Sequence, residues 1–182
     1  MSHSNTNRML AYWDARREDR SAPLRSAIDP SDFSDIMTQA FVVGRDRCGV
    51  YPFRLAGALI EDLHRGPLLA LDFTELWTAA DRPRLQSAIE AALQRGEALL
   101  VQALGRTLAG QQARLEILMA PVADAGGQID RLLGFYQPVS PLFRLQNQPI
   151  HRLALLEAAF AGSGEPVPEP LRLASVGGRR IA

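Results

Sequence analysis

The sequence predicts an α+β domain in which helices cover an antiparallel sheet. The first observation is a segment over 82–95 whose apolar residues recur at helical spacing, so that they share one face. The second is a series of strand-like segments after it, 97–106, 112–122 and 129–137, separated by glycine-containing turns typical of hairpins. A helix with one apolar face must pack on another layer, and this sheet is the nearest one.

The ends of the 82–95 helix are also marked. Asp81 can cap the first turn, and Pro83 fits inside that turn because the first backbone N–H groups of a helix have no internal partner. Gly96 stands where a left-handed residue commonly ends a helix.

A leading helix is predicted near the start of the chain. A polar residue among positions 5–7 can cap it, and Met9, Leu10 and Trp13 lie on one side. A short helix with this much apolar surface must pack on the domain or on a second copy of the chain. A linker over 21–25 follows it.

Two further strands are predicted before the long helix. A short helical segment starts at Asp29-Pro30, and the strands cover 39–45 and 50–56. Pro52 cannot donate to a sheet ladder, so its end of the second strand is expected at an edge or a bulge. A short helix over 58–64 and a helical turn over 73–77 connect these strands to the long helix.

The C-terminal part is predicted to hold one more short helix, over 150–160, with Leu153, Leu156 and Phe160 on one side. The remainder is rich in glycine, proline and serine and is expected to be disordered, apart from a short strand over 171–176. The predicted division of the chain is a leading helix and linker over 1–26, a domain over 27–145, and a C-terminal helix and tail over 146–182.

Composition excludes several classes of protein. The chain has 182 residues with 20 basic and 20 acidic side chains, and this balance argues against a nucleic-acid-binding protein. Its single cysteine, Cys48, rules out an intramolecular disulfide. We find neither an apolar signal core nor a run of about 18 apolar residues. We therefore expect a soluble, cytoplasmic protein without membrane contact.

The order of the elements resembles the PAS fold, and several stretches resemble a bacterial family of stand-alone, single-domain PAS proteins. The stretches are Leu10-Ala11-Tyr12-Trp13, Ala27-Ile28-Asp29-Pro30, Phe53-Arg54-Leu55-Ala56-Gly57, Phe73-Thr74-Glu75-Leu76-Trp77, Leu115-Glu116-Ile117-Leu118-Met119-Ala120-Pro121 and Leu132-Leu133-Gly134. The resemblance covers about 8–145 and implies a five-stranded antiparallel sheet in the order 2-1-5-4-3, with the helical crossover on one face. The chain departs from the family pattern over 64–70, a stretch that walls the ligand pocket in PAS folds. The resemblance therefore assigns no ligand.

The resemblance implies a non-enzymatic sensory or regulatory domain that acts through protein–protein interaction, which a small ligand between sheet and helices could tune. The implied partners are a second copy of the chain, bound through the leading helix, and a signalling protein such as a histidine kinase or regulator. Two other interpretations stay open. A small isomerase- or dehydratase-like enzyme would need a buried histidine and a carboxylate facing one cavity, and a structural adaptor would have no ligand cavity.

The candidate residues form two groups. A filled core is the favoured interpretation of one set of apolar residues, which could otherwise line a ligand pocket: Phe41, Phe53, Leu55, Leu63, Trp77, Ile89, Leu93, Val101 and Phe135. Arg54, Gln102 and Tyr136 are candidates for polar groups aimed into such a pocket. The candidate interface residues are Met9, Leu10, Trp13, Leu115, Ile117 and Met119, because a strand that is apolar on both faces is typically covered on both.

No metal or cofactor is expected. Cys48 lies in a polar turn and lacks the surrounding motif with which light-sensing PAS domains bond a flavin. His64 lies roughly where a haem PAS domain carries its proximal ligand, but a lone histidine beside Gly66-Pro67 is more typical of an exposed position. No cluster has zinc-site spacing. Neither haem nor flavin is therefore predicted.

Overall fold

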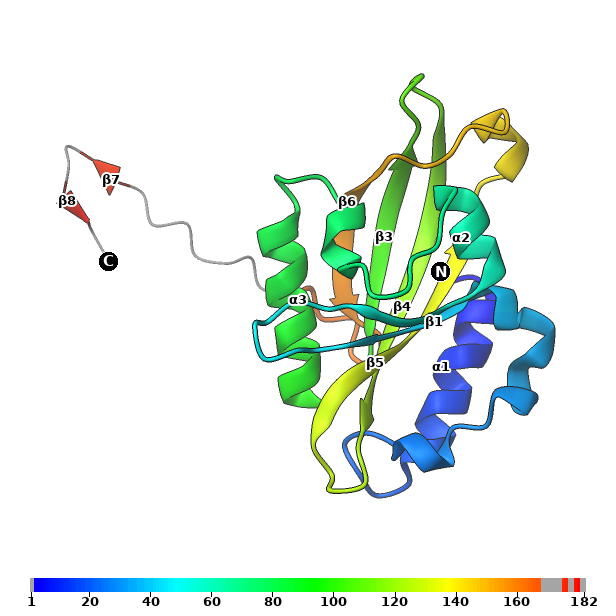
Figure 1. The fold of residues 1–182 in the computed structure, drawn as a ribbon. Coiled ribbons are helices and arrows are strands. Elements are labelled where there is room, and N and C mark those ends of the chain that lie inside the picture. The colour runs from blue at the N-terminus through cyan, green and yellow to red at the C-terminus, as the bar shows by residue number, and fades with distance from the viewer. Residues whose placement is uncertain (1, 168–174, 177–178, 181–182) are drawn as a thin grey trace.

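The computed structural model describes residues 2–167, 175–176 and 179–180 (Figure 1). The helical elements are α1 (Ser4–Arg17), α2 (Ala58–His64), α3 (Arg82–Arg95) and the 3₁₀ segments η1 (Arg25–Ala27), η2 (Pro30–Gln39), η3 (Phe73–Leu76) and η4 (Leu142–Leu145). The strands are β1 (Ala40–Gly44), β2 (Phe53–Ala56), β3 (Leu99–Arg106), β4 (Gln112–Ala123), β5 (Ile129–Pro138) and β6 (Arg152–Phe160), with β7 (Ser175–Val176) and β8 (Arg179–Arg180) in a separate pair.

The main sheet is antiparallel, with the strand order β2-β1-β5-β4-β3-β6. The predicted order of the first five strands is confirmed, and the sheet has six strands rather than five. Strand β2 begins only at Phe53. Tyr51 bonds to Asp72 and Phe73, and Pro52, whose carbonyl still accepts from the Gly44 N–H of β1, forms an isolated bridge with Asp72 on its other side. Pro52 thus lies at the edge of the sheet, as its missing N–H predicts.

The predicted helix over 150–160 is wrong, because this segment forms strand β6 along the outer side of β3. Leu153 and Phe160 are buried, but Leu156 is 44% exposed, so the helical spacing of these residues does not define a face. A bulge in the β3–β6 register shifts the alternation midway and hides the strand period. A short apolar segment is ambiguous between helix and strand, and the open edge of β3 decides this case.

The ends of two helices differ from the predictions. The α1 helix begins at Ser4 and is capped by the side chain of His3, whose Nδ1 accepts from the Asn5 N–H at 3.2 Å. The α3 helix has the predicted bounds and ends at Gly96, whose φ is +66°. Asp81 precedes it without capping it, because its Oδ2 accepts from the Thr78 hydroxyl and from the Leu155 N–H on β6.

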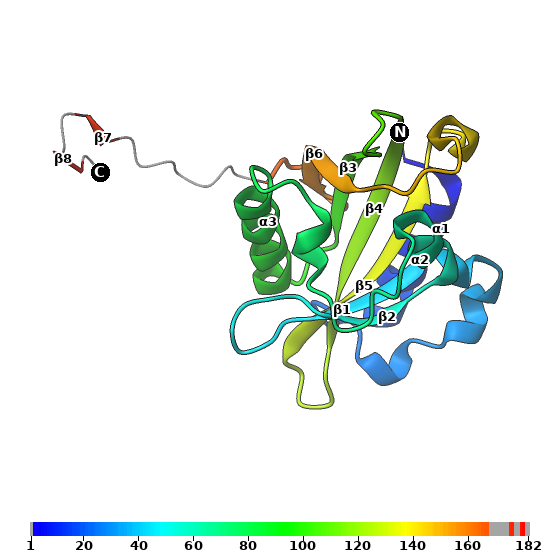
Figure 2. The ribbon, with the colours of Figure 1, turned by 45° about the horizontal axis from the view of Figure 1, so that its top comes forward.

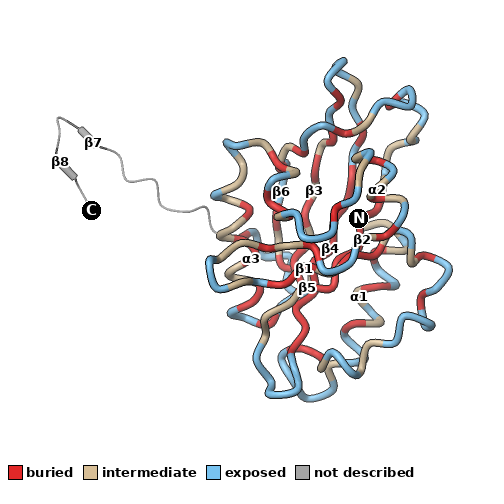
Figure 3. The backbone as a smooth tube through the Cα atoms, viewed as in Figure 1, coloured by how far each residue is buried: buried red, intermediate tan, exposed pale blue. Residues whose placement is uncertain are grey.

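Helices lie on both faces of the sheet (Figures 1 and 2), and the strands of the sheet are mostly buried (Figure 3), with one cluster of apolar side chains on each face. The first cluster, the inner layer, lies between the sheet and α2, η3 and α3, and the second, the outer layer, lies beneath α1 and η2. In the described part of the chain no helix is long and apolar enough to cross a membrane. Most of the tail predicted to be disordered, and positions 171–174 of the predicted last strand, lie outside the described residues.

Candidate functional site

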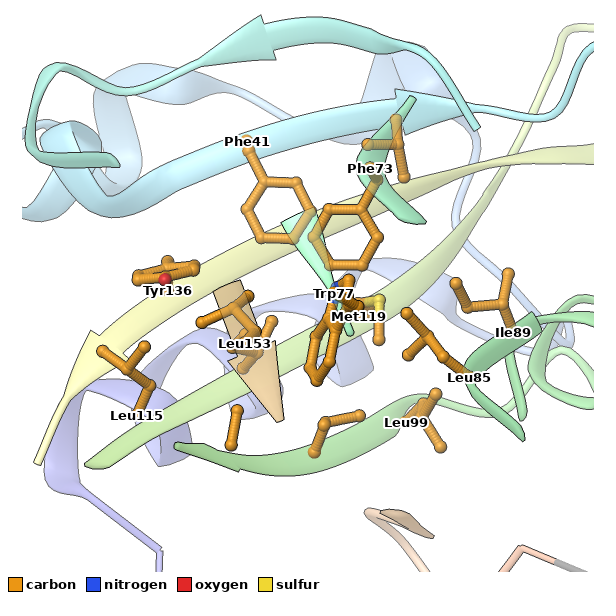
Figure 4. Packing of buried hydrophobic residues seen from close by; sticks show 14 of the residues in the cluster. Phe41, Phe73, Trp77, Leu85, Ile89, Leu99, Leu115, Met119, Tyr136 and Leu153 are labelled. Carbon is orange, nitrogen blue, oxygen red and sulfur yellow. The ribbon is translucent and has the colours of Figure 1, made fainter. Parts of the chain in front are cut away.

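The space between the sheet and its crossover helices holds a cluster of buried aromatic and aliphatic side chains (Figure 4). The rings of Phe41 and Phe73 stack with their centroids 5.3 Å apart, and Trp77 meets Phe73 edge-on at 5.9 Å. The ring of Phe41 also covers Gly134, where an added Cβ would lie 2.0 Å from the ring. The absence of a side chain at Gly134 is therefore what lets Phe41 lie on the sheet.

Seven of the nine pocket candidates belong to this inner layer. They are Phe41, Phe53, Leu63, Trp77, Ile89, Leu93 and Val101. All seven are buried, and their side chains pack against one another as a core, which is one of the two interpretations that the sequence allows.

Leu55 and Phe135 do not belong to the inner layer, so their assignment to an inner pocket is wrong. Phe135 lies beneath α1, because side chains alternate along β5 and its neighbours Gly134 and Tyr136 face inward. Leu55 is 42% exposed and borders a hollow on the outer face of the sheet.

His64, at the end of α2, is held by two hydrogen bonds rather than exposed. Its Nδ1 lies 3.1 Å from the Ile150 carbonyl, and its Nε2 lies 3.1 Å from the Tyr136 hydroxyl. A carbonyl can only accept, so Nδ1 carries the proton and Nε2 accepts from Tyr136. The pKa of His64 is lowered to about 4, mainly by burial and to a smaller extent by the positive charge of Arg152, while the hydrogen bond to the Ile150 carbonyl acts in the opposite direction. The imidazole is therefore neutral at physiological pH.

The other two polar candidates face outward. Gln102 donates to Glu116 across the outer face of the sheet at 2.9 Å, and Arg54 borders the same outer hollow as Leu55. Tyr136 does face inward, but its hydroxyl is used by His64. Of the three candidates for polar groups aimed into an inner pocket, only Tyr136 therefore lies on the predicted face of the sheet.

The outer face of the sheet is covered by α1 of the same chain. Met9 and Trp13 are buried there, and the Trp13 Nε1–H donates to the Pro121 carbonyl at 2.7 Å. Leu10 is partly buried beside them. The apolar side of α1 is therefore used within one chain, and the residues that face away from the sheet, such as Asn7, Arg8 and Asp14, are exposed.

Three of the interface candidates lie on the opposite face from α1. Leu115, Ile117 and Met119 are fully buried in the inner layer, whereas Leu118 and Ala120 lie beneath α1. Assigning the first three to an interface made by α1 is therefore wrong. The strand is apolar on both faces, so composition alone could not say which set meets the helix.

Glu116 is a buried carboxylate in the otherwise apolar middle of strand β4. One of its oxygens accepts from the His3 N–H at 2.9 Å and the other from the Gln102 side chain at 2.9 Å. It therefore ties the start of α1 to the sheet. Glu116 is only 2% exposed, so these two hydrogen bonds replace the hydrogen bonds to water that the carboxylate loses on burial.

Cys48 and His64, the two residues considered as cofactor ligands, have surroundings that the structure defines. The space between the sheet and the helices holds the packed rings of Phe41, Phe73 and Trp77. Cys48 is exposed in the β1–β2 turn, and His64 already bonds through both ring nitrogens. Among the described residues no three histidine, cysteine, aspartate or glutamate side chains come together as metal ligands.

The family model of the PAS domain matches residues 1–137, so the chain belongs to the PAS domain family. This finding agrees with the element order, the strand order and the leading helix described above. A search of curated proteins found no match.

Solved structures with a similar fold include sensory domains. An RNA-binding light-oxygen-voltage receptor is 19% identical with a TM-score of 0.49, covering 69% of this chain and 36% of the receptor. A light-oxygen-voltage domain studied with a flavin analogue is 21% identical with a TM-score of 0.49, covering 66% and 93%. The PAS domain of a protein from Colwellia psychrerythraea is 13% identical with a TM-score of 0.46, covering 60% and 96%. These sequence identities and TM-scores are too low for a ligand of any of these proteins to be assigned to this chain.

Proposed function

We propose that this PAS domain is a regulatory module that acts by binding another protein and that it catalyses no reaction. The observation that supports this most strongly is the filled inner layer, because an enzyme or an inner-pocket sensor needs a cavity between sheet and helices. The partner class that the family suggests is a signalling protein such as a histidine kinase or a regulator.

The enzyme alternative requires a buried histidine and a carboxylate that face one cavity. His64 is the histidine that comes nearest to this requirement, but its hydrogen-bond partners are the Ile150 carbonyl and the Tyr136 hydroxyl, and its depressed pKa keeps it neutral. A neutral histidine whose only lone pair already accepts a hydrogen bond is not free to take a proton from a substrate. This arrangement favours a structural role for His64.

The structural adaptor is a second candidate function, and the same filled inner layer favours it over a sensor with an inner ligand. The two candidates share the prediction that the chain binds a protein partner. They differ in whether a small molecule changes that binding, which native mass spectrometry and a partner-binding assay can separate.

The surface where α2 meets η4 is the place where we expect the partner to bind. Leu59 and Leu63 of α2 border a cleft with Leu142 of η4, and the neighbouring Phe143 is 79% exposed. Exposed aromatic side chains next to a cleft are common anchors in protein interfaces.

Binding of histidine kinases and response regulators to the immobilised domain tests this proposal. We expect Phe143→Ser to weaken the binding of the partner at least tenfold, whereas Leu108→Ser, at an 82% exposed position in the β3–β4 turn, should not change it. Equal binding by both variants would contradict the assigned surface, and binding of no signalling protein would contradict the function. Mass measurement by light scattering tests the predicted homodimer in the same samples.

A further inference from the structure

Helix α1 leaves part of the outer face of the sheet uncovered. It packs on β4 and β5, and the segment after it runs along the end of β4, where the Ala123 N–H donates to the Pro23 carbonyl at 2.9 Å. Between that segment and the β1–β2 edge lies a hollow with a volume of about 360 Å³. We call it the arginine groove and define it by Arg25, Val42, Arg54, Leu55, Arg131 and Leu133.

The arginine groove combines an apolar floor with a basic rim. Val42, Leu55 and Leu133 supply the floor, and the three arginines come from η1, β2 and β5. The residues that line the groove include no aspartate or glutamate. The chain as a whole has equal numbers of basic and acidic residues, so this excess of positive charge is local.

Two of the arginines converge over Gly44. A Cβ built there would lie 3.3 Å from Arg54 Nε and 3.8 Å from Arg131 Cγ. A break in the β1–β2 register falls opposite Arg54, so Arg54 and Leu55 both border the groove instead of alternating. The glycine and the bulge together place both arginine side chains in one small space.

The positive charges in the groove are poorly compensated. Within the described residues Arg25 and Arg54 form no ion pair, and Arg131 Nε lies 3.7 Å from Asp130 Oδ1, which is too long for a hydrogen bond. A bound anion would compensate these positive charges while accepting charge-assisted hydrogen bonds from the guanidinium groups.

We propose that the arginine groove binds a small organic anion with an apolar body. Its carboxylate or phosphate head would be held between Arg54 and Arg131, and its hydrocarbon part would cover Leu55 and Leu133. The volume lies within the usual range of small-molecule sites, and guanidinium groups match both head groups in shape and charge. This site is on the opposite face of the sheet from the filled inner layer, and it does not depend on the proposed partner surface.

Titration calorimetry of the full chain with decanoate tests the proposal, with decanol, inorganic phosphate and phosphatidylglycerol vesicles as separate comparisons. We expect decanoate to bind more tightly than either decanol or phosphate, because only decanoate offers both halves of the ligand. Arg54→Gln and Arg131→Gln should each weaken decanoate binding about tenfold or more, as expected for loss of a charge-assisted hydrogen bond. Arg47→Gln removes one exposed arginine outside the groove and should leave binding unchanged.

Circular dichroism of each variant shows that it is folded, so that a loss of binding can be assigned to the groove. Leu55→Ser tests the floor independently, because Leu55 is 42% exposed and its replacement should weaken decanoate but not phosphate. Equal binding of decanoate by Arg54→Gln, Arg47→Gln and the wild type would overturn the proposal. The proposal would also be overturned if decanol bound as tightly as decanoate. Binding to the vesicles together with no measurable binding of decanoate would overturn it as well.

Discussion

Gly134 is the residue on which the packing of the inner layer depends most directly. A methyl group at this position would overlap the Phe41 ring, which stacks on Phe73 and cannot move without displacing it. We expect Gly134→Ala to lower the free energy of unfolding by about 3 kcal/mol or more, because overpacking a dense core forces strain. Urea unfolding followed by tryptophan fluorescence measures this change.

A second glycine provides the control for this prediction. An added Cβ at Gly66 would meet no atom within 4 Å, so Gly66→Ala should change stability by less than about 1 kcal/mol. Combining Gly134→Ala with Phe41→Leu should recover part of the loss, since the smaller side chain makes room. Equal changes in the free energy of unfolding for Gly134→Ala and Gly66→Ala would contradict the prediction, because the Phe41 ring would then make room for the methyl group without destabilising the fold.

His64 should make the stability of the fold depend on pH. Its pKa of about 4 in the folded chain lies below the ordinary value of 6.5. Between these two pH values the unfolded chain is therefore protonated at this residue, whereas the folded chain is not. The contribution of the neutral His64 to the free energy of unfolding is fully present above pH 6.5 and is lost as the pH falls towards 4. The free energy of unfolding should decrease by roughly 2–3 kcal/mol over this range. Urea unfolding at pH 7 and pH 4.5 measures it.

The variant His64→Phe should be less stable than the wild type at pH 7 but should lose less stability between the two pH values. His151, which is exposed, is the control, and His151→Phe should keep the pH dependence of the wild type. An unchanged pH dependence in His64→Phe would mean that other groups account for the effect.

At the scale of elements, Trp13 attaches α1 to the sheet. Replacing it with phenylalanine removes the hydrogen bond that Trp13 Nε1–H donates to the Pro121 carbonyl, and the smaller ring leaves a small cavity. We expect a loss of about 2 kcal/mol, and faster hydrogen exchange in α1 than in α3. Tyr12→Phe, which removes the exposed hydrogen bond to the Asp29 N–H, should cost less than about 1 kcal/mol. Similar losses for both variants would contradict the anchoring role of Trp13.

Asp81 joins the start of α3 to the edge strand β6. Its Oδ2 accepts from Leu155 N–H at 3.0 Å and from the Thr78 hydroxyl at 2.6 Å. Asp81→Ala should therefore cost about 1–3 kcal/mol, because it leaves two donors unpaired. Asp81→Asn keeps an oxygen acceptor and should cost less. Thermal unfolding of the two variants compares them, and an asparagine variant as unstable as the alanine variant would exclude this explanation.

At the scale of the whole molecule, β6 protects the edge of the sheet. It pairs with β3 from Leu99 to Arg106, and its own outer side bonds to Thr78, Asp81 and Glu165. A chain that ends at Gln148 should expose the unpaired edge of β3 and form large aggregates by light scattering. A chain that ends at Val167 is the control and should stay dispersed. A dispersed short chain would show that β6 is dispensable.

Much of this fold follows from local sequence patterns. The bounds of α3, the short helix α2, the strands β3 to β5 and the edge position of Pro52 agree with the periodicity and the turn residues of their segments. The polar residues of the site were harder to place. His64 bonds to residues 72 and 86 positions away, and Glu116 accepts from His3, 113 positions away, so no local sequence pattern predicts these contacts.

The amino-acid pattern alone specified most of the helices and strands up to residue 138 and the family to which the chain belongs, because the apolar period is a local property. Tertiary structure decided that 152–160 is a strand, that Phe135 meets α1 while Tyr136 meets His64, and that α1 covers its own sheet. The physical reason is that a strand apolar on both faces fits either layer equally well by composition. Only long-range pairing and the mutual fit of side chains such as Phe41 and Gly134 select one arrangement.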